Sequence, residues 1–403
     1  MGQKGVTGNV LLSHIIFAMV WAGLLCPITF NQGNNNPMLY PMVALAATAF
    51  AIKASGGFIL SGGLKRFVIL MLALAVVSTA GLVLASTSSD VKYIWYIIAI
   101  VMFVCAISSG AVKVALIVTE TIWFVAVCVC FAGVVFGYFD VSLQNTLSGL
   151  LVFSFAFVVL CLLRSREGSK GILETNGRFG GVIVALGGVF SLAIVMTSRA
   201  RTALVVAVII GVIYFVTLRL HPSRKTLKKS YYALVIIVVI CLLVYVNAKS
   251  FGWYEILNSF SQEYFGKNID SSRPALWGGA ISALGSDVLF GLGTGVQPDG
   301  IFAGKSFHNS FLQLLIQNGL VGLVLFVAAL GMLWMQIAER RIEKSTLFAL
   351  SVFAGILIYN CFETTLLCNK LALGFIEWMI IAYAVGGAEA VGCGEEFDTI
   401  CRK

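Results

Sequence analysis

The sequence has 403 residues, of which 59% are hydrophobic and only 11% are charged. Apolar segments of about 20 residues, the length that crosses a bilayer as a helix, recur along the chain. This pattern excludes a soluble globular protein. The net charge of +9 does not indicate nucleic-acid binding, because the lysines and arginines lie in loops where they set membrane topology. We therefore predict an all-α, polytopic integral membrane protein with about twelve transmembrane helices.

The predicted spans divide the chain into four parts. Residues 1–248 hold the first nine spans, 249–307 form one large polar loop with short helices, 308–387 hold the last three spans, and 388–403 form a tail. The twelve spans are 9–30, 38–55, 65–86, 92–109, 112–137, 148–165, 180–198, 202–219, 231–248, 308–336, 345–365 and 369–387.

The distribution of basic residues predicts the orientation of these spans. If the N-terminus lies inside, 19 of the 27 lysines and arginines fall on the cytoplasmic side. Loops rich in lysine and arginine stay in the cytoplasm. Both termini are therefore predicted to be cytoplasmic, and the 249–307 loop is predicted to face the periplasm or exterior.

Two arginines interrupt this pattern between the seventh and eighth spans. Arg199 and Arg201 lie in the run Thr197-Ser198-Arg199-Ala200-Arg201-Thr202, on the predicted outer face. They could extend to lipid headgroups. A guanidinium also binds phosphate oxygens in a bidentate manner, as a lipid diphosphate would offer them. Their position against the positive-inside rule favours a function of this kind.

The large outer loop carries a third arginine at a predicted helix start. Arg273 precedes Pro274, and proline is common in the first turn of a helix. The residues that follow place Trp277, Ile281 and Leu284 on one helical face. That face would dock onto the bundle or lie on the bilayer surface.

His308 is the one histidine predicted on the outer face, and it lies at the start of the tenth span beside Asn309. A lone histidine in this place can be a simple cap or headgroup contact. An imidazole can also take a proton from an attacking hydroxyl near neutral pH. Further along, Gly319 and Gly322 are spaced for close helix packing. The earlier run 291–295 is interpreted as a turn, because it lacks the lysine and serine of a nucleotide loop.

Several stretches of the outer loop and the following span form a series. They are Arg273 with Trp277, Phe290-Gly291-Leu292-Gly293, His308-Asn309-Ser310-Phe311-Leu312 and Asn318-Gly319-Leu320-Val321-Gly322. Together they resemble the O-antigen ligase and O-antigen (polysaccharide) polymerase superfamily of membrane glycosyltransferases. Its upstream arginine motif resembles either Ser198-Arg199 or Arg201-Thr202-Ala203-Leu204, which leaves the matching arginine open.

The resemblance implies a GT-C-like membrane enzyme and an inverting, metal-independent transfer of an undecaprenyl-diphosphate-linked glycan. It implies that Arg199, Arg201 and Arg273 bind the donor diphosphate, with Trp277 and Asn309 also in the substrate site. His308 would be the catalytic residue. No cofactor is expected.

The residues alone agree with this chemistry. The outer face has no supply of nucleotides, so a lipid-linked sugar is the natural activated donor. The predicted outer carboxylates include Glu363 near a span end, and none forms an aspartate pair of the metal-binding type. We therefore expect no metal site.

Three functions fit the sequence at this point. The first is an O-antigen ligase of the bacterial inner membrane, which uses lipid A–core as acceptor at the periplasmic face. The second is a polymerase that extends a lipid-linked repeat. The third is a transporter of the same lipid-linked glycan, which would more often carry charges at the bilayer midplane and two related halves. The sequence favours the ligase slightly and the transporter least.

Overall fold

The computed structural model describes residues 14–25, 60–84, 92–110, 116–138, 144–167, 177–198, 200–271, 273–294, 296, 306–367 and 370–386. Within these ranges the chain is helical and contains no strand, as its composition predicts. The predicted span at 38–55 and the tail at 388–403 lie outside the described residues.

Most of the predicted spans coincide with helices. The first is His14–Leu25, and the others are α3 (Gly62–Leu84), α4 (Lys92–Ser108), α5 (Leu116–Val135), α6 (Gln144–Arg166), α7 (Gly177–Thr197), α8 (Arg201–Leu220), α9 (Arg224–Val246), α12 (Ser310–Ala338), α13 (Lys344–Tyr359) and α14 (Leu371–Gly386). Among the described helices, seven are long and apolar enough to cross a membrane. This composition confirms a polytopic membrane protein, while the number of twelve spans stays a prediction.

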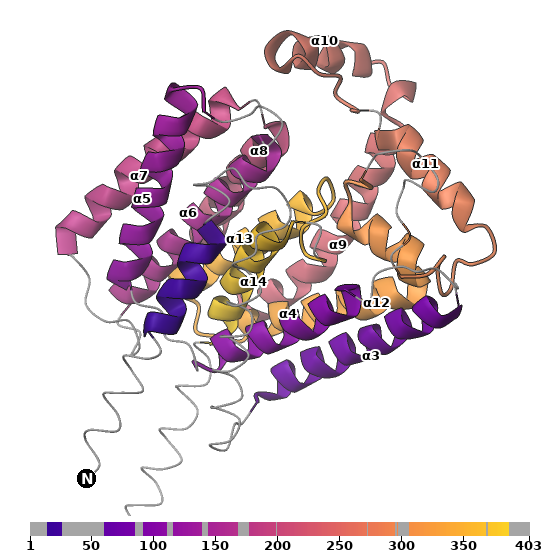
Figure 1. The fold of residues 1–403 in the computed structure, drawn as a ribbon, viewed down its shortest axis with the longest axis horizontal. Helices are drawn as coiled ribbons and strands as arrows, with labels where there is room; N and C mark the ends of the chain where they lie inside the picture. The colour runs from indigo at the N-terminus through magenta and orange to yellow at the C-terminus, as the bar shows by residue number, and fades with distance from the viewer. Residues whose placement is uncertain are drawn as a thin grey trace, which may run out of the picture.

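The polar stretch after α9 holds short helices. They are the 3-10 helix η2 (Ala248–Ser250), α10 (Tyr254–Phe265) and α11 (Arg273–Leu284). Figure 1 shows α10 extending away from the bundle, while α11 lies beside α9 and α12, with which it is in contact. We call the end of the bundle that carries residues 248–296 the loop face.

The helices pack in two groups, which are joined by α13 and α14. Helices α5, α6 and α7 contact one another, and α12 packs along α3, which in turn contacts α4. Helices α13 and α14 lie between these groups, against α8 and α4 respectively (Figure 1). Neighbouring helices can approach closely where a glycine on one helix faces an aromatic ring on the other. At Gly187 of α7, a Cβ would lie only 2.5 Å from the ring of Trp123 on α5.

Helix α12 is broken at Gly319, whose φ of 65° and ψ of −170° are not helical. The break frees backbone groups on both sides, and in a membrane each of these needs a partner within the protein. Residues 288–293 of the polar loop supply the partners. The hydrogen bonds are Leu292 N to Ile316 O (2.7 Å), Gly293 N to Gln317 O (3.2 Å), Leu320 N to Val288 O (2.8 Å) and Val321 N to Leu289 O (3.2 Å).

This arrangement changes the expected role of Gly319. A Cβ at this position would overlap the backbone carbonyl of Leu289, so the glycine admits a loop rather than another helix. Gly322 does lie at a helix contact, because a Cβ there would be 3.5 Å from Leu74 of α3. Gly291 and Gly293 have φ values of 78° and 107°, which glycine adopts readily in a turn.

Candidate active site

A cavity of about 530 Å³ lies at the loop face. Its walls come from the ends of α8, α9 and α13, from α10, and from the start of α11. Its polar lining includes Asn145, Arg201, Lys267, Arg273 and His308. Three residues singled out from the sequence, Arg201, Arg273 and His308, therefore line one cavity although about a hundred positions separate the first from the last.

Arg201 is the first residue of α8, and its guanidinium reaches across to the connection between α10 and α11. Its Nη1 donates to Ser261 Oγ at 2.5 Å, Asn268 O at 3.0 Å and Lys267 O at 3.5 Å, and its Nη2 donates to Ser271 Oγ at 2.7 Å. All four acceptors are uncharged. Arg201 thus holds the polar loop against the bundle and places a positive charge at the cavity.

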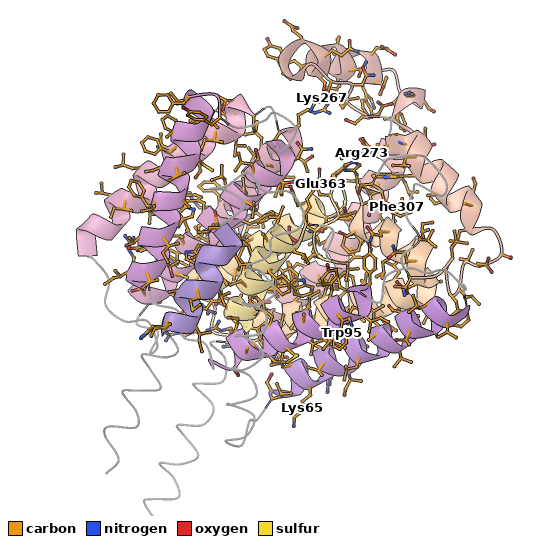
Figure 2. All side chains as sticks on the ribbon, in the orientation of Figure 1. Lys65, Trp95, Lys267, Arg273, Phe307 and Glu363 are labelled. Atoms are coloured by element: carbon orange, nitrogen blue, oxygen red, sulfur yellow. The ribbon has the colours of Figure 1, made fainter. Side chains whose placement is uncertain are left out.

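Arg273 is the first residue of α11 and is mostly buried, with 12% of its side chain exposed. Its Nη2 lies 3.6 Å from Oε1 of Glu363, and its guanidinium lies 5.7 Å from the centre of the Phe362 ring. A guanidinium over an aromatic face is a stabilising arrangement. Figure 2 shows Arg273 above and to the right of Glu363, with Lys267 further out on the same side.

Glu363 is the carboxylate that the charged residues of the site surround, and it lies in the turn between α13 and α14. The residue is fully buried. Its Oε2 is 3.0 Å from Lys370 Nζ and 3.7 Å from His308 Nδ1, and its Oε1 accepts a hydrogen bond from Asn145 Nδ2 at 3.4 Å. Burial alone would raise the pKa of this carboxyl, but Lys370, His308 and Arg273 outweigh burial and lower the pKa to about 2. Glu363 therefore carries a negative charge at neutral pH, next to the positive charges of Arg273 and Lys370.

His308 lies just before α12 in an uncommon backbone conformation, with a φ of 50°. A non-glycine residue in this region stores about 1–3 kcal/mol of strain, and such residues cluster at functional sites. The side chain is 38% exposed, but its Nδ1 is buried and faces Glu363 at 3.7 Å. That distance is too long for a hydrogen bond, so the contact is electrostatic. A carboxylate facing Nδ1 favours the proton on that nitrogen and leaves Nε2 free to accept one.

Two other residues singled out from the sequence lie near the cavity without lining it. Asn309 caps α12, and its Oδ1 accepts from Phe311 N and Leu312 N at 3.0 and 2.9 Å. Trp277 is buried and donates from its indole nitrogen to Phe307 O at 2.8 Å. Both therefore hold the segment that carries His308. Arg199 lies outside the described residues.

The face expected on α11 is present in part. Trp277 and Leu284 are buried, together with Leu276 and Ala280, in a small hydrophobic cluster with Phe307, whereas Ile281 is 54% exposed. The helix therefore docks onto the bundle. Sequence reasoning missed the central position of Glu363. The available signal was an acidic residue near the end of an apolar segment, close in sequence to Lys370.

Comparison with protein families supports the motif analysis. Residues 186–327 match the family model described as O-antigen ligase, which covers roughly a third of the chain. The matched region contains Arg201, Arg273 and His308, while Glu363 follows it in sequence. A search of curated proteins found no match.

Proposed function

We propose that this protein is an O-antigen ligase, a membrane glycosyltransferase. The match of residues 186–327 to the O-antigen ligase family model supports this proposal. It would transfer a glycan from undecaprenyl diphosphate to a hydroxyl of lipid A–core. The enzyme would act at the periplasmic face of the bacterial inner membrane, with both termini in the cytoplasm. The observation that carries the proposal is the common cavity lined by Arg201, Arg273 and His308.

The composition of the cavity suits the proposed donor. Arg201, Arg273 and Lys267 supply positive charge for a diphosphate, and guanidinium groups bind phosphate oxygens in pairs. Apolar side chains complete the walls, among them Leu204, Val205, Leu257 and Phe260. Val205 and Phe260 are each 54% exposed, so the apolar wall continues to the outside of the bundle. An isoprenoid chain could therefore extend from the cavity into lipid.

The proposed reaction is a direct displacement at the anomeric carbon. His308 Nε2 accepts the proton of the acceptor hydroxyl as its oxygen forms the new glycosidic bond. The bond from the anomeric carbon to the diphosphate oxygen breaks on the opposite face, and undecaprenyl diphosphate leaves with the electron pair. Arg201 and Arg273 stabilise the charge that develops on this leaving group. Glu363 holds the imidazole in the tautomer that the step needs.

The acceptor decides between ligase and polymerase, and the family description favours the ligase. We expect purified protein, incubated with a lipid-linked repeat and lipid A–core, to join the glycan to the core. Longer lipid-linked chains without core attachment would instead identify a polymerase. A protein that makes neither product but moves the lipid-linked glycan across reconstituted vesicles would be a transporter.

The arginines provide a separate test of the donor site. We expect Arg273→Ala, and at least one of Arg201→Ala and Arg199→Ala, to reduce transfer at least ~100-fold while expression is retained. Alanine removes charge-assisted hydrogen bonds to the diphosphate. Arg→Lys should restore transfer only in part, because an ammonium lacks the guanidinium fork. Product formation by purified variants, normalised to folded protein, is the measurement.

Arg219→Ala is the matched control for Arg201→Ala. Both arginines belong to α8, but Arg219 lies in its last turn, with its guanidinium 4.9 Å from the centre of the Phe215 ring. Its loss should leave transfer unchanged. Wild-type transfer by Arg199→Ala, Arg201→Ala and Arg273→Ala alike would show that the donor binds elsewhere.

The proposed orientation predicts which cysteines can be labelled in intact cells. A cysteine that replaces Glu263, in the exposed part of α10, should react with a membrane-impermeant thiol reagent. A cysteine at Lys228, near the start of α9, should react only after the cells are opened. The labelling of each variant is compared with that of the native protein, because the chain already has ten cysteines. Labelling at position 228 in intact cells would reverse the topology and move the site to the cytoplasmic face.

A further inference from the structure

We infer that a buried hydrogen-bond network between Glu377, Thr365 and Asn360 positions His308 and Glu363 for transfer. The inference rests on the proposed function, because positioning has meaning only if these two residues act on the substrate. None of the network residues lines the cavity.

The network begins inside α14. Glu377 is fully buried there, in a helix otherwise almost wholly apolar. An ionisable residue within a membrane helix is disfavoured unless polar partners accompany it. Thr365 Oγ1 lies 2.9 and 2.8 Å from the two carboxyl oxygens of Glu377, and Asn360 Nδ2 donates to one of them at 3.1 Å. The carboxyl thus fastens both ends of the 360–366 turn to α14.

Asn360 also forms hydrogen bonds to the other end of the turn. Its Oδ1 accepts from Thr365 N at 3.1 Å and Leu366 N at 3.0 Å, which closes the turn on itself. The same oxygen accepts from Ser310 Oγ at 2.6 Å. A single buried amide therefore joins the turn to the first residue of α12.

Ser310 strengthens that junction through its backbone. Its N–H donates to Asn360 O at 2.9 Å and to Glu363 O at 3.2 Å. His308 lies two residues before Ser310, and Glu363 lies within the turn. The network thus fixes the backbone that carries the imidazole against the backbone that carries its carboxylate partner, which faces it at 3.7 Å.

A substitution that weakens the network should lower turnover more than it lowers the affinity for the donor. Of the three cations that we propose for the diphosphate, Arg273 touches the turn, through Glu363 at 3.6 Å. Arg201 and Lys267 belong to α8 and to the α10–α11 connection, and their hydrogen bonds are made within the polar loop. A shift of about 1 Å at a reacting group can reduce turnover about 100-fold. A purely structural role would instead reduce the amount of folded protein and leave turnover per folded molecule unchanged.

The test compares Thr365→Val, Thr365→Ser and Ser351→Ala in the purified full-length protein. Valine keeps the shape of threonine but removes the hydroxyl, whereas serine keeps the hydroxyl. Ser351 is an equally buried hydroxyl of α13, and it donates only to Leu347 O of its own helix. We expect Thr365→Val to lower kcat at least ~10-fold, with the KM for the lipid-linked donor within about threefold of wild type. Thr365→Ser and Ser351→Ala should retain wild-type kcat.

A second pair covers the case in which Thr365→Val does not fold. In Glu377→Gln, the amide can still accept from Asn360 and can donate to Thr365 Oγ1, whose hydroxyl then donates to Asn360 Oδ1 at 2.9 Å. Glu377→Gln should therefore keep kcat, and Glu377→Ala should lose it. Wild-type kcat in both Thr365→Val and Glu377→Ala would overturn the inference, as would equal loss in the valine and serine variants. His308→Ala is measured beside them, because its retention of activity would overturn the proposed function instead.

Discussion

Replacement of His308 by alanine should reduce turnover at least ~100-fold, since general-base assistance contributes about 10²–10⁴-fold to a rate. Binding of the donor should change much less, because we propose that Arg201 and Arg273 hold the diphosphate. The measurement is a single-turnover rate of the purified variant, normalised to folded protein, together with the affinity for the lipid-linked donor.

His221→Ala is a suitable control for this variant. His221 also has a positive φ, of 45°, but it lies in the connection between α8 and α9, away from the loop face. The two substitutions therefore remove the same side chain from similar backbone conformations. If His308→Ala retains a rate within about threefold of wild type, the imidazole is not a general base and only holds the start of α12.

Replacement of Glu363 by glutamine should reduce both stability and turnover. The substitution keeps the size of the side chain but leaves Arg273 and Lys370 without their shared anion. Removal of one partner from a buried ion pair costs about 3–5 kcal/mol, and the partial exposure of both cations here reduces that figure. We expect a lower melting temperature in detergent and a fall in kcat of at least ~10-fold, because Nδ1 of His308 also loses its carboxylate.

The pH dependence of the native protein follows from the lowered pKa of Glu363. A carboxyl whose pKa is lower in the folded state stabilises the fold fully above its ordinary pKa, and this contribution is lost progressively as the pH falls from the ordinary value to the folded one. With a pKa of about 2, Glu363 remains ionised from neutral pH down to about pH 3. Its contribution to stability should therefore be complete at neutral pH and should be lost progressively as the pH falls from about 5 towards the folded value of about 2.

Glu339→Gln is the control for the charge change. Glu339 pairs with Lys228 at 2.8 Å, and 60% of its side chain is exposed. An exposed pair contributes about 0–1 kcal/mol, so the melting temperature should change little. Equal melting temperatures and turnover for Glu363→Gln and the native protein would remove Glu363 from the site.

The sequence predicted the helices well because membrane spans depend on local composition. The predicted span 202–219 became α8 at residues 201–220, and 345–365 became α13, which ends at Tyr359. The six-residue difference in the second case moves Glu363 out of the helix and into a turn. An apolar run cannot show this boundary, because the turn is as buried as the helix beside it.

The candidate site was predicted from residue types, but its internal contacts were not. Arg273 and His308 were singled out as a phosphate binder and a base, and both line the cavity. That Glu363 joins them depends on contacts between residues 55 to 90 positions apart, which no local pattern contains. Asn309 and Trp277 were interpreted as substrate contacts because of their motifs. That role stays a prediction, while in the structure Asn309 Oδ1 caps α12 and the Trp277 indole nitrogen donates to a buried carbonyl.

The break in α12 determines how the polar loop could be exchanged between related proteins. Residues 288–293 supply the hydrogen bonds that the two halves of α12 lack at Gly319. A chimera that takes its loop from a relative but keeps this α12 must reproduce the turn at Gly291 and Gly293, because backbone amides and carbonyls are otherwise left unpaired inside the bundle. The loop from Val288 onward and the first half of α12 should therefore be exchanged together. Exchanges meant to alter acceptor choice should keep their junctions outside residues 288–321.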